Sequence, residues 1–210
     1  MKLWPLILPL CGLLLGCGTV DVRDTLLGPV VTRFEDPEYA PRFAALAQTQ
    51  APALQIGFVE RQEGGTLLLE RRDGAFEYWL TPEGGQIILQ NGMLHGTRGF
   101  GEGLLASELS EPLAHIRGLQ GGYSDRFHTY LDGNDRAVAR TYRCLFTRGE
   151  ISDTALRSGA VRTVQMREDC RSLDQEFTNI YWVTPGARRI VQSRQWAGPY
   201  IGALSTRVVE

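Results

Sequence analysis

The chain has 210 residues, of which 43% are hydrophobic and 22% are charged, with 24 glycines and 10 prolines. This length and composition suit one globular domain and exclude a disordered polymer, a collagen and a coiled coil. The formal net charge is −2 and the basic residues form no run, which argues against nucleic-acid binding, since that needs a positive patch. Lys2 is the single lysine, so arginine supplies almost all of the positive charge.

The first sixteen residues have the pattern of a lipoprotein signal peptide. Lys2 is followed by a short apolar stretch, 3–15, that two prolines interrupt. The stretch is too short and too rich in helix breakers for a membrane-spanning helix. It ends in Leu14-Leu15-Gly16-Cys17, which resembles the lipobox of bacterial lipoproteins, in which the thiol after the cut receives a diacylglyceryl group. We expect residues 1–16 to be removed and Cys17 to be lipidated; an ordinary secretory signal with a chance cysteine is the alternative.

The expected anchor also predicts where the protein is located. Each buried methylene of an acyl chain contributes about 0.8 kcal/mol, so two or three chains hold a protein on a bilayer almost permanently. Gly18 follows the cysteine, where an aspartate would be the usual signal for retention in the inner membrane. By resemblance to that sorting rule, we expect a lipid-anchored outer-membrane protein that faces the periplasm. Residues 17–36 are expected to form the lipidated end and a tether, and residues 37–210 a single all-β domain.

One short helix is predicted at the start of this domain. Asp36-Pro37 favours a helix start, and apolar residues recur at helical spacing within 39–50, before Pro52. Little other helix is expected anywhere in the chain.

From Leu54 onward, short β-rich runs alternate with turn signals. Asp73-Gly74 and Asn91-Gly92 are strong hairpin signals, because both residues of such a turn must tolerate positive φ. The connections leave no room for the crossover helices of a parallel sheet. We therefore predict an all-β domain, an antiparallel meander that forms a barrel or a sandwich. The predicted strands are 54–60, 66–72, 75–80, 86–89, 93–97, 127–131, 137–147, 161–170, 176–184, 188–196 and 204–209.

Cys144 and Cys170 are the two cysteines left once the signal is removed and Cys17 is acylated. Two cysteines in the oxidising periplasm are expected to form a disulfide. Closing this loop of roughly 27 residues contributes about 3 kcal/mol in the chain-entropy model. Two buried free thiols are the competing interpretation. A metal site is not expected, because neither cysteine has a C-x-x-C partner.

The sequence contains no recognisable catalytic motif. It lacks the G-x-S-x-G elbow, the Walker phosphate loop and the H-E-x-x-H zinc motif. His95, His115 and His128 have spacings that match no common metal pattern, so no metal and no other cofactor are expected. Carboxylates are plentiful, but sequence does not reveal which two would face each other as in a glycosidase. The protein is therefore expected not to be an enzyme.

Three segments together resemble one protein family. Residues 84–101 resemble its hairpin, in which an apolar strand and an Asn-Gly turn precede a T-x-G-x-G segment. Residues 141–144, together with Cys170, resemble the paired-cysteine region of some members. The most specific match is to the terminal signature, at 181–183 (Y-W-V) and 193–199 (S-R-Q-W-A-G-P). In these segments the chain is similar to the YjbF/GfcB family, the group 4 capsule polysaccharide lipoproteins.

The resemblance implies an all-β lipoprotein encoded among genes for exopolysaccharide or capsule secretion, with no assigned enzyme activity. The expected function is to assist export or assembly of an acidic exopolysaccharide or capsule as a non-catalytic binding or scaffolding component. The expected partners are the membrane, through the N-terminal lipid, the polysaccharide and other proteins of the export machinery, and not nucleic acid. One alternative is a polysaccharide-modifying enzyme, which a cleft with two close carboxylates would favour. The other is a barrel that carries a lipid, which a large closed apolar cavity would favour.

The terminal signature supplies the candidate contact residues. Pro185-Gly186 is expected to join strands 176–184 and 188–196 as a hairpin, so that aromatic and guanidinium groups stack across it. Outward-facing groups of this kind suit a glycan or a partner protein. The alternative is that the tryptophans are core residues and the arginine is a structural ion-pair partner. The candidate contact residues are Tyr181, Arg194, Gln195 and Trp196.

Overall fold

The computed structural model describes residues 39–134 and 136–209. The predicted signal peptide, the lipidated Cys17 and the tether all lie outside the described residues. From Tyr39 onward the chain forms one compact unit. This unit contains a single antiparallel sheet of twelve strands and two short helices, which confirms the predicted all-β fold class.

The sheet is a meander in which chain neighbours pair, and the last strand pairs with the first. The strands are β1 Ala53–Phe58, β2 Glu63–Asp73, β3 Phe76–Leu80, β4 Gln86–Gln90, β5 Met93–Arg98, β6 Leu104–Glu108, β7 Gly122–Leu131, β8 Ala137–Leu156, β9 Gly159–Arg171, β10 Glu176–Val183, β11 Ile190–Trp196 and β12 Ala203–Val209. Their order across the sheet is β5-β4-β3-β2-β1-β12-β11-β10-β9-β8-β7-β6. The helices are α3 Pro41–Ala47 and α4 Ser110–Gly118.

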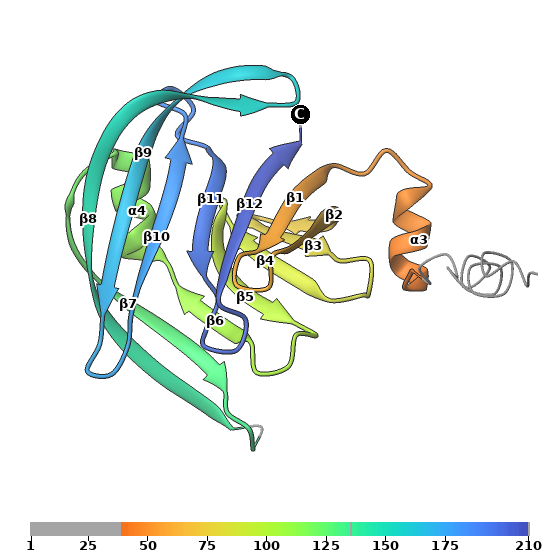
Figure 1. Cartoon of the computed structure of the whole chain (residues 1–210), viewed down its shortest axis with the longest axis horizontal. Helices are drawn as coiled ribbons and strands as arrows, with labels where there is room; N and C mark the ends of the chain where they lie inside the picture. The colour runs from red at the N-terminus through yellow and green to blue at the C-terminus, as the bar shows by residue number, and fades with distance from the viewer. Residues whose placement is uncertain (1–38, 135, 210) are drawn as a thin grey trace, which may run out of the picture. The chain divides into compact units, whose positions relative to one another are not determined.

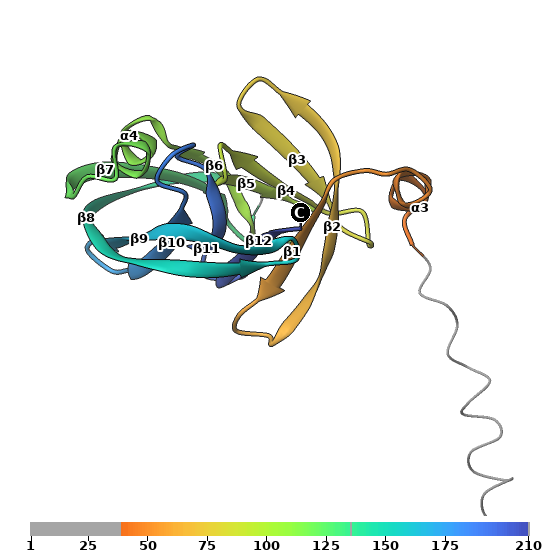
Figure 2. The ribbon, with the colours of Figure 1, turned by 90° about the horizontal axis from the view of Figure 1, so that it is seen from above.

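The sheet curls until its two end strands, β5 and β6, lie side by side, and so forms a nearly closed barrel (Figures 1 and 2). His95 Nδ1 of β5 lies 2.9 Å from the carbonyl oxygen of Ser107 in β6. Gly96 allows this close approach, because a Cβ atom there would lie 2.7 Å from the carbonyl oxygen of Leu105. Each end strand thereby covers the other, which removes most of the exposed sheet edge.

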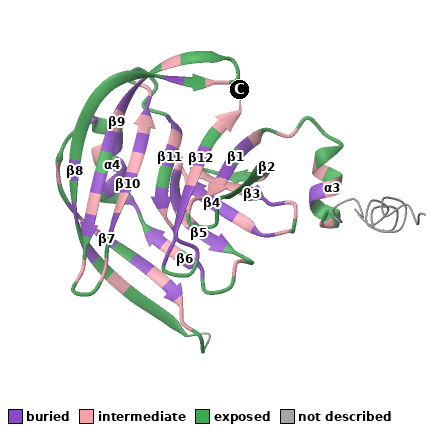
Figure 3. Cartoon of the chain, in the orientation of Figure 1, coloured by how far each residue is buried: buried purple, intermediate pink, exposed green. Residues whose placement is uncertain are grey.

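Apolar side chains fill the barrel as two clusters, visible as the buried positions that alternate along the strands in Figure 3. The helix-side cluster is built mainly from α4, β8, β9 and β10, and its members include Leu113, Ile116, Phe146, Met166 and Val183. The strand-side cluster is built mainly from β1 to β5 and β12, and its members include Leu54, Leu67, Ile87, Leu94 and Leu204. Alternation with period two puts these residues inside and their chain neighbours outside.

The helix predicted within 39–50 is present as α3, and all eleven predicted strands are present. The expectation of little other helix is wrong for α4, and strand β6 was not predicted. Both carboxylate oxygens of Glu108 accept the backbone N–H of Ser110, at 3.0 and 3.1 Å, and so satisfy an unpaired donor at the start of α4. Pro112 is tolerated because it lies in the first turn, where its N–H would lack a helical partner anyway. Within residues 39–134 and 136–209, no helix has both the length and the apolar character needed to cross a membrane.

The predicted disulfide between Cys144 and Cys170 is confirmed. The two residues are directly opposite each other in the register of β8 and β9, and their sulfur atoms are bonded. Both cysteines are buried in the helix-side cluster, and Cys144 lies on the same face of β8 as Tyr142 and Phe146. The bridge therefore joins two adjacent strands inside the barrel.

Candidate functional site

The four residues of the predicted contact surface do not share one surface. The hairpin of β10 and β11 is present, with Tyr181 opposite Ser193 and Trp182 opposite Gln192. Tyr181 lies on the inner face and is fully buried, because the alternation of β10 sends it inward and Trp182 outward. The prediction that Tyr181 faces outward is therefore wrong.

Gln195 is also buried, which corrects its expected position on a surface. Its side-chain oxygen accepts the backbone N–H of Leu94 at 2.7 Å, and its Nε2 donates to the carbonyl oxygen of Gly92 at 3.0 Å. These bonds cross the barrel interior from β11 to β5 and fix the β4–β5 turn. Gly92 makes this contact possible, because a Cβ atom there would lie 2.9 Å from that of Ile190.

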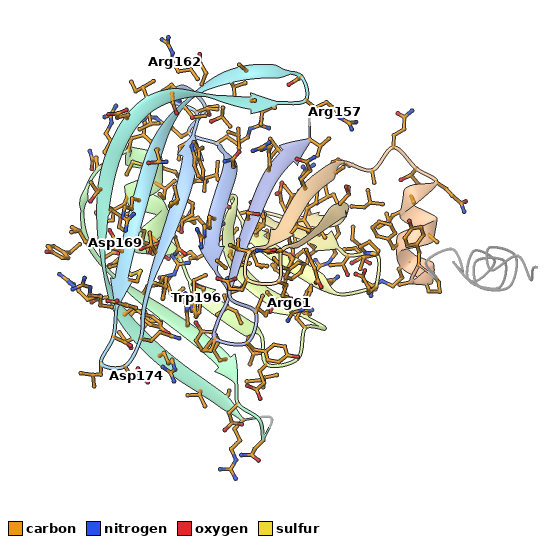
Figure 4. All side chains as sticks on the ribbon, viewed as in Figure 1. Arg61, Arg157, Arg162, Asp169, Asp174 and Trp196 are labelled. Atoms are coloured by element: carbon orange, nitrogen blue, oxygen red, sulfur yellow. A yellow bond between two sulfur atoms is a disulfide. The ribbon has the colours of Figure 1, made fainter. Side chains whose placement is uncertain are left out.

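Trp196 is half-buried at the end of β11 (Figure 4), whereas Arg194 is exposed on the outer face of the sheet. The Trp196 ring stacks on Phe177, with 5.9 Å between centroids and 12° between planes. The backbone N–H of Trp196 donates to Asn179 Oδ1 at 2.7 Å. Trp196 thus packs against the helix-side cluster, and a contact role for Arg194 and Trp196 stays a prediction.

A network of charged and polar side chains, unpredicted from sequence, crosses the interior between β7, β9 and β10. Arg126 Nη1 donates to Glu168 Oε1 and Oε2 at 2.9 and 3.0 Å, and both side chains are buried. Asn179 Nδ2 and the Tyr181 hydroxyl also donate to Glu168 Oε2, at 2.8 and 2.7 Å. A buried carboxylate needs such donors, since an unpaired buried charge is very costly.

His128 extends this network toward the strand-side cluster. Arg126 Nε donates to His128 Nε2 at 2.7 Å, so Nε2 must be unprotonated and the ring proton must lie on Nδ1, 2.6 Å from the Tyr130 hydroxyl. Burial, together with the positive charge of Arg126, holds the pKa of His128 well below its ordinary value. Burial and the neighbouring Glu168 carboxylate raise the pKa of Tyr181 well above its ordinary value. His128 and Tyr181 are therefore neutral at physiological pH.

The network has the residue types of a catalytic centre but no access for a substrate. Arg126, His128, Glu168 and Tyr181 are each at most 1% exposed. Glu168 also lies with Cys144 and Cys170 in a group whose ligand atoms are within 4.8 Å of one another. Because the two sulfur atoms are bonded to each other, neither offers a thiolate to a metal. The arrangement holds three strands together, and its donors and acceptors are occupied by one another.

An open cleft of about 670 Å³ lies at the end of the barrel where β1 begins and β12 ends. Its lining comes from separate parts of the chain: Arg72 of β2, Arg117 of α4, and Arg188 and Arg189 of the β10–β11 turn. Among the residues that the structure describes, Glu77 is the single acidic member of the lining. We call this site the end cleft. Its charge is opposite in sign to the net charge of the chain.

A second, shallower hollow of about 570 Å³ lies on the outer face of β2, β1, β12, β11 and β10. Trp182, Arg194 and Arg207 project around it, and Arg207 Nε donates to Gln192 Oε1 at 2.8 Å. Gly57 and Gly65, which have no side chains, are among its lining residues. We call this site the outer hollow; it contains Arg194, the one exposed member of the predicted contact set.

Comparison with known proteins identifies the family of the chain. A crystal structure of the hypothetical lipoprotein YmcC from Escherichia coli (K12) is similar, with a TM-score of 0.68 and 15% identity, over 92% of this chain and 97% of that chain. At this identity the similarity concerns the fold alone. No curated protein shows significant sequence similarity to the chain. Residues 26–209 match the family described as group 4 capsule polysaccharide lipoprotein gfcB, YjbF, and the chain therefore belongs to this family.

Proposed function

We propose that this protein is a lipid-anchored, non-catalytic binding component in the export or assembly of an exopolysaccharide or capsule. The observation that carries the proposal is the family match over residues 26–209. The geometry supports binding rather than catalysis, because the ionisable network around Glu168 is sealed inside the barrel. The open sites are hollows lined by arginine, tryptophan and amide side chains, which suit sugar hydroxyls and acidic groups.

The end cleft does not favour the alternative of a polysaccharide-modifying enzyme. A glycosidase needs two facing carboxyl groups, roughly 5–9.5 Å apart. Within residues 39–134 and 136–209, the lining of the end cleft contains one carboxylate, Glu77, which accepts from Arg72 Nε at 3.1 Å and from Trp79 Nε1 at 3.2 Å. A carboxylate occupied by two donors is poorly placed to act as an acid or a base.

The proposal includes an anchor at Cys17 that holds the domain at the periplasmic face of the outer membrane. The lipobox-like segment supports this position, as does membership of a lipoprotein family. Mass spectrometry of the protein purified from membranes should give a mature N-terminus at Cys17 carrying acyl chains. A Cys17→Ser variant should lose the acyl chains and leave the membrane fraction. An unmodified N-terminus on the native protein would contradict the anchor.

The functional proposal is tested by deleting the gene and measuring surface polysaccharide. We expect surface glycan to fall, to be restored by the wild-type gene, and to be restored incompletely by Cys17→Ser. Lipid composition and amino-acid metabolism serve as controls and should not change. Unchanged surface glycan in the deletion strain would remove the proposal.

The outer hollow is the proposed contact surface within this function. Arg194→Ala should lower surface glycan without lowering the melting temperature, because the side chain is exposed. Arg162→Ala is the matched control, since Arg162 is an exposed arginine of β9 that does not line the hollow (Figure 4). If both variants support wild-type glycan, Arg194 is not a contact residue.

A further inference from the structure

We infer that the end cleft binds a carboxylated segment of the polysaccharide, an inference that rests on the proposed function and specifies its ligand. Three elements that are far apart in sequence each bring an arginine to this cleft: β2 brings Arg72, α4 brings Arg117, and the β10–β11 turn brings Arg188. All three side chains are exposed. Their convergence is unexpected in a chain of net charge −2 and creates a local positive field.

Among the described residues that line the end cleft, one carboxylate compensates only part of the positive charge. Arg72 is paired with Glu77, the one acidic residue in the described part of the lining, and that part offers Arg117 and Arg188 no second carboxylate. A guanidinium group presents its N–H donors as a planar fork that matches the two oxygens of a carboxylate. A ligand with carboxylates at intervals, such as a chain of uronic acids, therefore fits the charges of the cleft.

The turn that carries Arg188 holds it in an unfavourable backbone conformation. Arg188 has φ 55°, in the left-handed region where glycine is preferred. Its N–H donates to the carbonyl oxygen of Thr184 at 3.0 Å, and Thr184 Oγ1 accepts the N–H of Arg189 at 3.1 Å. Residues held in this region cluster at ligand sites, where the surrounding structure maintains them. A long cationic side chain stands here, at the rim of the cleft, where glycine would fit the backbone better.

The shape of the cleft favours a chain segment over a flat membrane surface. A volume of about 670 Å³ lies within the range of roughly 300–1,000 Å³ that is usual for small-ligand sites. Pro52, Ala53 and Trp79 contribute apolar lining to the same cleft. A sugar ring presents both C–H surfaces and polar groups, so it can use both kinds of lining. A lipid headgroup layer would reach the rim arginines but would leave the apolar lining uncovered.

The test is binding by the full mature protein, purified in detergent and studied by isothermal titration calorimetry. The probe is a tetramer of α-1,4-linked galacturonic acid, and its methyl ester is the neutral counterpart. The acid should bind and the ester should not, and the affinity should fall as salt is raised because added ions screen the charges. Equal binding of acid and ester, or no binding of either, would overturn the inference. Dihexanoyl phosphatidylglycerol is the competing anion: arginine-dependent binding of this lipid without binding of the tetramer would also overturn it.

Two variants and one control separate charge recognition from folding. Arg117→Gln combined with Arg188→Gly should weaken acid binding about tenfold, as expected when two charged hydrogen-bonding groups are lost from a solvated site. Glycine suits the left-handed position, so the melting temperature should hold or rise while the affinity for the acid falls. Arg61→Gln is the control: Arg61 lies past the far end of β1, in the β1–β2 connection, and stacks on Phe58 there (Figure 4). Unchanged affinity in the double variant, or an equal loss in Arg61→Gln, would contradict the assignment.

This binding test and the deletion test fail in different ways. If the tetramer does not bind but deletion lowers surface glycan, the end cleft is not the acidic-sugar site and the proposed function stands. If the tetramer binds through these arginines but deletion leaves surface glycan unchanged, the binding site stands and the proposed function fails.

Discussion

The two halves of the barrel interior achieve stability by different means. The strand-side cluster around β1 to β5 consists of aliphatic and aromatic side chains, and the buried polar residues beside it, such as Gln195 and Thr206, are uncharged. The helix-side cluster around β7 to β10 adjoins a buried ion pair and its hydrogen-bond partners, and it contains a disulfide. The strand-side core can tolerate substitution by residues of similar size, because burial of apolar area does not depend on direction. The helix-side interior depends on each polar group keeping its partner.

The two longest strands, β8 and β9, belong to the helix-side half. β3 and β4 span five residues each, whereas β8 spans twenty and β9 thirteen. Long paired strands have many possible registers, and a shift of one residue would exchange their inner and outer faces. Two features fit one register only. They are the placement of Glu168 opposite Phe146 and the bridge between Cys144 and Cys170. We interpret the buried polar network and the disulfide as the features that define this register.

The largest expected effect follows from breaking the buried ion pair. Glu168→Leu leaves the Arg126 guanidinium buried without its carboxylate and should lower the free energy of unfolding by about 3–5 kcal/mol. Arg126→Met with Glu168→Leu should be less destabilising than Glu168→Leu alone, because no uncompensated charge remains. Chemical denaturation measures both. In the strand-side cluster, Ile87→Val is the mild reference, at about 0.5–1.5 kcal/mol. A Glu168→Leu loss no larger than that reference would contradict the distinction between the halves.

Removal of the disulfide comes next in size. The cross-link joins residues 26 apart in sequence, so replacing Cys144 and Cys170 by alanine should cost about 3–4 kcal/mol in the chain-entropy model. Reduction under denaturing conditions, followed by refolding with the thiols blocked, gives an independent measurement. Equal stability of the oxidised protein and the double variant would show that the register of β8 and β9 does not need the bridge.

Two residues of β11, Trp196 and Arg194, sharpen the contrast between interior and surface. Trp196→Ala removes a ring stacked on Phe177 and should cost about 2–4 kcal/mol, somewhat less than a fully buried aromatic. Arg194→Ala removes an exposed side chain and should change stability by less than about 0.5 kcal/mol. Thermal unfolding of the two variants checks the ranking. A neutral Trp196→Ala would mean that the ring belongs to the surface after all.

The smallest effect is a pH dependence that belongs to the helix-side network. The pKa of His128 in the folded protein lies well below its ordinary value of 6.5, because of burial and the Arg126 charge. As the pH falls below about 6.5, the unfolded chain therefore binds a proton at this residue that the folded chain does not. The free energy of unfolding should then fall by up to about 1.4 kcal/mol per pH unit between pH 6.5 and 5.

His128→Gln isolates this contribution, since the glutamine amide oxygen can still accept from Arg126 and does not titrate. The variant should lose the extra slope between pH 6.5 and 5 relative to the wild type. Identical slopes in the two proteins would show that His128 does not titrate as the geometry requires.

Much of the fold follows from sequence, and the reason lies in its turns. Asp73-Gly74 and Asn91-Gly92 predict hairpins that are present, with Gly74, Asn91 and Gly92 at positive φ. β6 was missed because its sequence, L-L-A-S-E, carries no β-branched residue and follows a glycine-rich segment. Signals for α4 existed, namely Glu111 and Pro112 in its first turn and apolar residues three apart at Leu113 and Ile116.

The sites were less predictable, for a physical reason. Arg126 and His128 lie two residues apart in β7, which is also the spacing of polar residues on the solvent-exposed face of a strand. The spacing therefore does not show whether these side chains point into the barrel or out of it. Only the strand order brings them to Glu168. Tyr181 and Gln195 are residue types that often bind ligands, but here their hydrogen bonds join strands of the barrel. The end cleft joins residues from β2, α4 and the β10–β11 turn, and no local pattern connects these segments.

One measurement connects the end cleft to the proposed function. It is the amount of surface polysaccharide per cell in a strain whose only gene copy carries Arg117→Gln with Arg188→Gly. The protein should be present in the membrane at the wild-type amount, because the side chains of Arg117 and Arg188 are exposed. Glycine also adopts the left-handed backbone conformation of position 188 more readily than arginine does. We predict that surface glycan falls toward the level of the deletion strain, whereas Arg61→Gln retains the wild-type level. Wild-type glycan in the double variant, at equal protein amount, would contradict a role for this cleft in polysaccharide export.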